Sequence, residues 1–265
     1  MPKQVGFMKL KGNLDGVSFY QKNGESFARK AIGPSKAMIE KSPKFKEFRD
    51  NRREFTGSLQ TVRALRKTLN AAERTMFDPS FAVRAGKIFR LITNRHDDAR
   101  GKRPIESKLQ ADLFKEFDLH AEREFGKVFN VLGITTAIDA ARTTVTLTVP
   151  AFSIDKAVAV PELTTHFRLI NLCGVMSAYA YNEEMKKYMP VDKDNDTLYA
   201  VAYSDYLPIK GDSNAITIAA TLSTVANLGT DSAILSAIGI QFFDQRGTKY
   251  HSTSKNGSMR ILKLF

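Results

Sequence analysis

Apolar and polar residues alternate with a period of two near the start of the chain, on both sides of Asn23-Gly24. This dipeptide favours a type I′ turn, because both central residues of that turn need positive φ. The resulting register places Tyr20 opposite Phe27 and Lys22 opposite Glu25, so an aromatic pair and an ion pair face each other across two strands. The pattern predicts a β-hairpin with large apolar groups on both faces. Since an isolated hairpin is marginal in water, we expect another surface to cover it.

The apolar period then changes to that of an α-helix. Ser42-Pro43 combines a good N-cap with a good first helical residue. The apolar positions that follow predict one buried stripe of an amphipathic helix: Phe45, Phe48, Phe55, Leu59, Val62, Leu65, Leu69 and Ala72. Gly57 predicts a kink or an interruption in this helix. A second helix is predicted after Asp78-Pro79, with Arg84 on its basic outer face, and residues 104–119 form a third helix or a loop.

The composition changes again at about residue 125, where Thr, Val, Ala and Ile dominate. Short apolar runs separated by turn residues predict an antiparallel β-sandwich. The expected strands are residues 127–132, 143–149, 165–172, 176–181, 198–203, 215–222, 235–244, 249–252 and 259–265, with the last turn at Lys255-Asn256-Gly257.

These patterns together predict an α+β fold in three parts. Residues 1–41 form a basic N-terminal arm with a β-hairpin, residues 42–124 form a basic helical region, and residues 125–265 form the β-sandwich domain. No internal repeat of fixed period is visible in the sequence.

The charge of the chain is unevenly distributed. The formal net charge is +12, and counting along the sequence assigns +14 to residues 1–110 and −2 to residues 111–265. Such a division indicates a partner that is acidic, nucleic acid first and an anionic membrane surface second. The alternative is a basic surface that is only solvated. The cations that we expect to contact a polyanion are Arg49, Arg52, Arg53, Arg63, Lys67, Arg100, Lys102 and Arg103.

None of the motifs that carry chemistry is complete in this sequence. Asp192, Asp194 and Asp196 resemble the start of a calcium loop, but the Gly and Glu that such a loop needs at its sixth and twelfth positions are missing. The four histidines are scattered, and no carboxylate pair is marked by an apolar setting. Cys173 lies in an apolar run that is typical of a buried thiol. We therefore predict no enzyme activity, no metal and no cofactor.

The sequence also predicts where the protein resides. No apolar window is long enough to span a membrane, and the N-terminus lacks the apolar core of a signal peptide. We expect a cytoplasmic protein, or one that leaves the cell without a cleaved signal as a released particle or an extracellular assembly.

Two stretches, KGNLDGVSFYQKNGESFARK and SPKFKEFRDNRREFTGS, resemble the opening of an uncharacterised family of basic bacterial proteins. Its members share a G-x-(V/L)-x-F-Y hairpin, an R-x-N-x-x-E-F helix start, a basic R-G-x-R loop and a C-terminal β region. The helix start corresponds to Arg49–Phe55 and the loop to Arg100–Arg103, and the closing IQFFDQRGTKYHSTSKNGSMRILKLF resembles that family's end. The resemblance implies that the hairpin, the helix start and the C-terminal strands act as one unit. It implies no activity.

Architecture and charge lead to a functional hypothesis. We expect a non-enzymatic, self-assembling structural protein, a coat- or filament-like subunit, whose basic N-terminal part contacts nucleic acid or a neighbouring subunit. Phe19, Tyr20 and Phe27 are expected to dock on a sheet edge or groove of that neighbour. The alternatives are a nucleic-acid-binding protein that does not assemble, and a ligand-binding β-sandwich or hydrolase with its site in the C-terminal domain.

Overall fold

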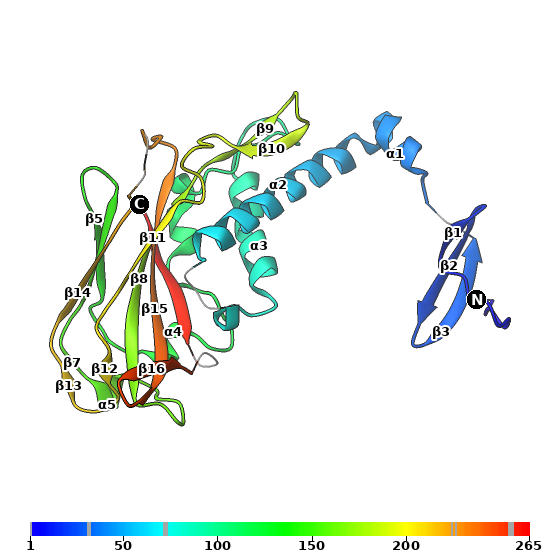
Figure 1. Cartoon of the computed structure of the whole chain (residues 1–265). Helices are drawn as coiled ribbons and strands as arrows, with labels where there is room; N and C mark the ends of the chain where they lie inside the picture. The colour runs from blue at the N-terminus through cyan, green and yellow to red at the C-terminus, as the bar shows by residue number, and fades with distance from the viewer. Residues whose placement is uncertain (1, 31–32, 71–73, 224, 226, 254–256) are drawn as a thin grey trace. The chain divides into compact units, whose positions relative to one another are not determined.

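The computed structural model describes the chain except for residues 1, 31–32, 71–73, 224, 226 and 254–256 (Figure 1). The chain divides into two compact units, Met1–Arg49 and Asp50–Phe265. Helices and antiparallel sheets are both present, with the largest sheet in the C-terminal region. The α+β class is therefore confirmed, whereas the division at residues 41 and 124 stays a prediction.

The first unit contains a three-stranded antiparallel sheet. Its elements are β1 (Gly12–Leu14), β2 (Val17–Lys22), β3 (Glu25–Lys30), α1 (Lys36–Lys41) and the 3₁₀-helix η1 (Pro43–Phe45). The predicted register is confirmed, since Tyr20 pairs with Phe27 and Lys22 with Glu25. The Tyr20 and Phe27 rings stack with centroids 5.7 Å apart. The carboxylate of Glu25 bonds to Lys3 Nζ (2.8 Å) and not to Lys22 as expected, because residues before β1 run beside β3.

The two long helices occur where the sequence predicted them. They are α2 (Lys46–Thr68) and α3 (Phe81–Asn94). The apolar stripe of α2 is buried only in its C-terminal half, since Phe48 and Phe55 are exposed. Polar and small residues take the buried positions between Asp50 and Thr61: Asp50, Glu54, Gly57, Ser58 and Thr61. The helix runs through Gly57 without the predicted interruption, and Ala72 lies outside the described residues.

The second unit is built on a seven-stranded antiparallel sheet. Its strand order is β11–β8–β15–β17–β4, with β12 paired to β8 and β16 paired to β15. These strands are β4 (Phe117–Asp118), β8 (His166–Met176), β11 (Tyr199–Tyr203), β12 (Leu207–Pro208), β15 (Ala233–Arg246), β16 (Lys249–Ser252) and β17 (Ser258–Leu264).

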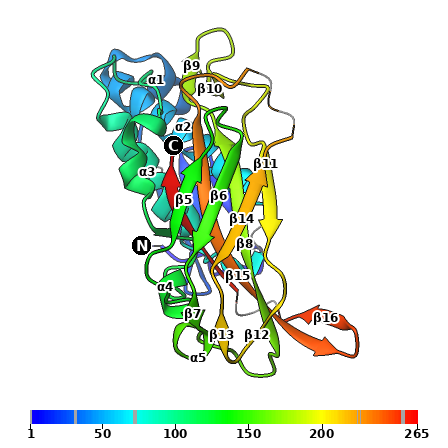
Figure 2. The same cartoon turned by 90° about the vertical axis from the view of Figure 1, so that its left-hand side faces the viewer.

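Helices cover one face of this sheet and a second sheet covers the other (Figures 1 and 2). The second sheet has the order β14–β6–β5. Its strands are β5 (Thr135–Ile138), β6 (Thr144–Val149) and β14 (Ile216–Thr221). The smaller elements are η2 (Arg74–Met76), η3 (Lys108–Phe114), α4 (Phe125–Val128), β7 (Phe152–Ser153), α5 (Ile154–Ala157), β9 (Tyr179–Asn182), β10 (Lys187–Pro190) and β13 (Asp212–Ser213).

Alternation along β8 divides the core between the two faces of the large sheet. Ile170 and Leu172 pack with α2 and α3, whereas Phe167 and Leu169 pack with the second sheet. Asn171 lies between the sheets, where its side-chain amide donates to backbone oxygens of β6 (2.8 Å) and β14 (2.7 Å). Both faces of the central strands are thus buried, which explains their near-continuous apolar runs.

Most of the predicted strands are present, but residues 176–181 hold the end of β8 and most of β9 and do not form one strand. The sequence did not predict the strands β4, β5, β7, β10, β12 and β13. Residues 127–132 do not form a strand, because Phe125–Val128 form the short helix α4. The N–H of Phe125, the first residue of this helix, donates to Asp118 Oδ1 (2.8 Å). Residues 165–172 belong to a longer strand, β8, that runs to Met176. The predicted turn at residues 255–257 lies mostly outside the described residues. The region 104–119, predicted as a helix or a loop, holds the 3₁₀-helix η3 and the short strand β4.

No helix in the described part of the chain is long and apolar enough to cross a membrane.

Arg84 is not on the outer face of α3 as expected. It is half-buried and donates to Asp78 Oδ2 (2.9 Å) and to the backbone oxygens of Asp118 (2.8 Å) and Leu119 (3.0 Å). Burial alone would raise the pKa of Asp78, but bonds from the Ala121 N–H, Ser80 and Arg84 outweigh it and lower the pKa to about 2. This ion pair fastens α3 to the segment that contains β4.

We expect Asp78→Asn to lower the free energy of unfolding by about 2 kcal/mol at pH 7. The pKa of Asp78 is lowered from 3.8, so its stabilisation is complete above about pH 4 and is lost as the pH falls toward 2. The difference between wild type and variant, measured by urea unfolding at several pH values, should shrink over that window. A difference that stays constant down to pH 2 would contradict this assignment.

Candidate docking and polyanion-binding surfaces

The loop after α3 is bound to the start of α2. The Arg103 guanidinium donates from Nε to Glu54 Oε1 (2.8 Å) and from Nη2 to Glu54 Oε2 (2.7 Å). The backbone N–H of Gly101 also donates to Glu54 Oε1 (2.7 Å). Arg100 donates from Nε and Nη2 to Asn51 Oδ1 (3.1 and 2.8 Å). We call these five residues the helix–loop clamp.

Glu54 carries a charge in the clamp although it is almost completely buried. Its side chain is 8% exposed and that of Arg103 is 14% exposed. Burial alone would raise the pKa of Glu54, but bonds from Arg103 and from the Gly101 N–H hold it below its ordinary value. Bonding to Glu54 likewise raises the pKa of Arg103. The donors of Arg103 are therefore directed at its own chain.

Two glycines allow the close contacts around the clamp. Gly101 has a φ of +93°, and a Cβ there would lie 2.6 Å from Asp50 Oδ1. One turn after Glu54, a Cβ at Gly57 would lie 2.6 Å from Cγ of Tyr188. The hydroxyl of Tyr188 donates to the backbone oxygen of Arg103 (3.0 Å), so the ring is held in place. The close approach of Asp50 thus explains why a glycine, Gly101, stands in the R-G-x-R loop.

Two more predicted cations belong to the same segments. Arg53 donates to Asp50 Oδ1 (3.1 Å), and its guanidinium lies 5.5 Å from the centroid of the Tyr181 ring. Lys102 forms an ion pair with Glu183. The structure therefore brings Arg53, Arg100, Lys102 and Arg103 together, each with an acidic or amide partner from its own chain.

The other four predicted cations lie elsewhere. Arg52, Arg63 and Lys67 are exposed on α2. Arg49, in the first unit, donates from Nη1 to the backbone oxygens of Ile39 (2.7 Å) and Ser42 (2.8 Å). It therefore binds the carbonyl end of α1. Polyanion contact stays a prediction for the whole set.

The predicted docking aromatics are half-buried inside the first unit. Phe19 lies on β2, and Tyr20 and Phe27 stack on each other. The Arg29 guanidinium lies 5.3 Å from the Tyr20 centroid, and Lys3 Nζ lies 6.0 Å from the Phe27 centroid. These rings have cations over them and are less open than other apolar groups of the same unit.

The most open apolar groups of the first unit are ones that sequence reasoning missed. Val5 is 93% exposed and Phe7 is 99% exposed. We call the exposed set the apolar arm residues: Val5, Phe7, Met8, Leu10, Leu14 and Met38. In the described part of Met1–Arg49, only Ser26 is classed as buried. The apolar run VGFMKL near the N-terminus is the sequence feature that could have indicated them.

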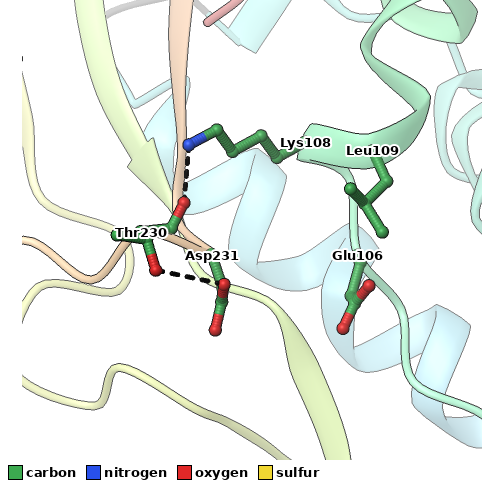
Figure 3. A pocket seen from close by; sticks show the side chains of 5 residues that line it. All are labelled: Glu106, Lys108, Leu109, Thr230 and Asp231. Atoms are coloured by element: carbon green, nitrogen blue, oxygen red, sulfur yellow. Dashed lines mark hydrogen bonds between the residues drawn. The ribbon is translucent and has the colours of Figure 1, made fainter.

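A hollow of about 350 Å³ lies between η3 and the turn before β15 (Figure 3). Lys108 Nζ donates across it to the Thr230 backbone oxygen (2.6 Å), and Thr230 Oγ1 donates to Asp231 Oδ1 (3.3 Å). Glu106 and Leu109 complete the lining. The two carboxylates lie on separate elements, and Figure 3 draws no bond between them. Glu106 Oε2 also lies 3.5 Å from His96 Nε2.

The candidate ligands for metal chemistry are dispersed. Within the described ranges, no group of three or more His, Cys, Asp or Glu side chains is placed to hold a metal ion. Asp196 accepts from the Tyr179 hydroxyl (2.7 Å), and Asp192 accepts from the Asn195 side chain (2.9 Å), so both carboxylates bond within the protein. Burial raises the pKa of the Cys173 thiol to about 12, which leaves it protonated at neutral pH.

The chain matches no protein-family model, no curated protein and no solved structure in the three comparisons made. The resemblance at the two ends of the chain receives no support from them. The fold is α+β, with a basic first unit and a large sheet in the second unit that is covered on both faces.

Proposed function

We propose that this chain is a non-enzymatic structural subunit that assembles with copies of itself through its first unit, Met1–Arg49. This unit contains the predicted arm, residues 1–41, and is called the arm from here on. In this proposal the two facing sheets of the second unit form a β-sandwich that accepts the arm of a neighbour. The exposed cations Arg52, Arg63 and Lys67 on α2 contact a polyanion. The clamp keeps the start of α2 rigid.

The observation that carries the proposal is an arm with regular structure and almost no core. Its strands pair in register, yet the large apolar side chains Val5 and Phe7 are almost fully exposed. A small sheet without a buried apolar face is not stable alone. Exposed apolar groups gathered on one segment are typical of an interaction surface.

Charge favours the β region of a second copy over a second arm as the partner of the arm. Residues 1–49 contain eleven Lys and Arg against four Asp and Glu, a net charge of +7. The β region, residues 125–265, contains thirteen Lys and Arg against twelve Asp and Glu, a net charge of +1. Two basic arms therefore repel each other, whereas the nearly neutral β region of another copy permits contact.

An open strand edge in the second unit supports the proposed mode of docking. β5 is the edge strand of the β14–β6–β5 sheet. Its sequence, Thr135–Ile138, contains neither the charged residue nor the proline that commonly protects an edge. An extended segment can add to such an edge through backbone hydrogen bonds, with alternate side chains giving specificity.

The double variant Val5→Ser, Phe7→Ser tests the arm in the full chain. Because each apolar side chain gains about 1 kcal/mol or more on burial, we expect the concentration at half-assembly to rise about 30-fold or more. Light scattering over a concentration series, with and without nuclease, measures this change. The nuclease arm reports whether nucleic acid contributes to particle size.

The matched control is Leu132→Ser, Leu163→Ser, which removes two apolar groups of the second unit that are each 87% exposed. This control should assemble as the wild type does. An equal effect of both double variants would contradict a specific role of the arm. A wild-type chain that stays monomeric at high concentration and low salt would contradict assembly itself.

A further inference from the structure

One end of the large sheet carries an arginine surrounded by aromatic rings. Arg168 lies on β8, with its Cζ 3.8 Å from the centroid of Tyr203 and 5.6 Å from that of Tyr206. Beneath them, the Phe243 centroid is 5.1 Å from the same atom, and Gln241 accepts from Arg168 Nε (2.9 Å). Arg168 on β8 pairs with Gln241 on β15, and on the other side of β8 Tyr203 of β11 pairs with Ile170. Tyr206 lies in the segment between β11 and β12.

Tyrosines extend this arrangement over the surface. Tyr206 stacks on Tyr250 with centroids 3.9 Å apart and an interplanar angle of 6°. Tyr203 is 44% exposed and Tyr206 is 37% exposed. We call Arg168, Tyr203, Tyr206 and Tyr250 the tyrosine platform. β12 and the β15–β16 hairpin lie at the same end of the large sheet (Figures 1 and 2), with Tyr250 on β16 and Tyr206 directly before β12.

Arg168 differs from three other half-buried arginines of the second unit in its partners. Arg84, Arg103 and Arg260 each bond to a carboxylate. Among the described residues, Arg168 bonds to Gln241 and contacts aromatic rings. No carboxylate of the described residues forms an ion pair with Arg168. A guanidinium held among rings is poorly hydrated, so an anionic ligand gains a strong charge-assisted hydrogen bond there.

We propose that the tyrosine platform binds single-stranded nucleic acid, with a phosphate at the Arg168 guanidinium and bases stacked on Tyr203 and Tyr206. Single strands are bound by aromatic faces that stack on bases together with cations that follow the backbone. A duplex cannot use the platform in this way, because its bases are stacked internally. The positive excess of the chain lies in residues 1–110, so residues outside the platform supply any long-range attraction for a polyanion. This site is independent of assembly through the arm.

Fluorescence anisotropy of a labelled oligothymidylate of about 12 nucleotides, a typical site size, tests the proposal on the full chain. Arg168→Gln should weaken binding by about 10-fold and reduce the slope of log K against log salt by about 1. Tyr203→Ala should also weaken binding by about 10-fold, with little change in that slope. Because Tyr203 is substantially exposed, this variant keeps the test valid even where Arg168→Gln fails to fold.

Arg90→Gln is the matched control, since it makes the same charge change at an exposed position on α3 that is not among the proposed polyanion contacts. Because it removes only long-range attraction, it should change affinity by less than about 3-fold. An equal loss in Arg90→Gln and Arg168→Gln would overturn the proposal. Equal affinity for a duplex of the same sequence would overturn it too, as would no binding of the single strand at about 50 mM salt, where phosphate contacts are strong.

Discussion

Replacing Glu54 by Gln is expected to lower the free energy of unfolding by about 3 kcal/mol at neutral pH. The variant leaves Arg103 charged and largely buried but without its carboxylate. An amide oxygen can still accept from the Gly101 N–H, yet it cannot balance the guanidinium charge. Urea unfolding followed by circular dichroism measures the loss.

Glu183→Gln is the control for this variant, since it makes the same substitution in the partner of another cation of the loop. Glu183 is 64% exposed and pairs with Lys102, which is 50% exposed. Solvent screens such a pair, so we expect a loss below about 1 kcal/mol. Equal losses in the two variants would show that the clamp contributes no more than a surface ion pair.

The effect of Glu54→Gln should also depend on pH in a defined direction. The pKa of Glu54 is lowered from 4.5 in the folded protein, so its stabilisation is complete above that value and is lost as the pH falls below it. The difference in unfolding free energy between wild type and variant should therefore be constant from pH 7 to about 5 and decrease below about 4.5. A difference that grows on acidification would contradict the assigned ion pair.

Gly57→Ala is expected to destabilise the protein by about 1–3 kcal/mol. Alanine is the better helix former by about 1 kcal/mol, so propensity alone predicts the opposite sign. The added Cβ would lie 2.6–2.9 Å from three ring carbons of Tyr188, whose hydroxyl is bonded to the clamp loop. We expect the steric conflict to prevail, with the loss measured by urea unfolding.

Gly86→Ala is the matched control, because Gly86 lies inside α3 and its nearest contact for a Cβ is Val62 Cγ2 at 3.9 Å. That distance is ordinary van der Waals contact, so this variant should gain up to about 1 kcal/mol. If both alanine variants had a higher free energy of unfolding than wild type, the Tyr188 ring would move at little energetic cost. The close approach of α2 to β10 would then contribute little to stability.

The N-terminal hairpin could be predicted to the residue. Asn23 and Gly24 have φ of 52° and 79°, and the strands pair in the register that this turn imposes. The determinants lie within a few residues of each other, so no distant contact was needed. The partner of Glu25 could not be predicted, because Lys3 reaches it only through the chain that precedes β1.

The start of α2 shows where periodicity fails. Phe48 and Phe55 fit the apolar stripe, yet they are exposed, while Asp50 and Glu54 are buried. An apolar period predicts burial only where the helix packs on an apolar surface. Here it packs on a loop that supplies a guanidinium and backbone N–H groups, so a carboxylate is the better buried residue.

The sequence by itself determined the α+β class, the hairpin register, the two long helices and most of the strands of the large sheets. Turn chemistry and side-chain period act over a few residues, so they can be read locally. Only the tertiary structure decided which charges are used internally. Glu54 and Arg103 are 49 residues apart, and Asp118 and Arg260 are 142 residues apart. The same holds for the tyrosine platform, whose rings meet Arg168 only because strands distant in the chain lie side by side in one sheet.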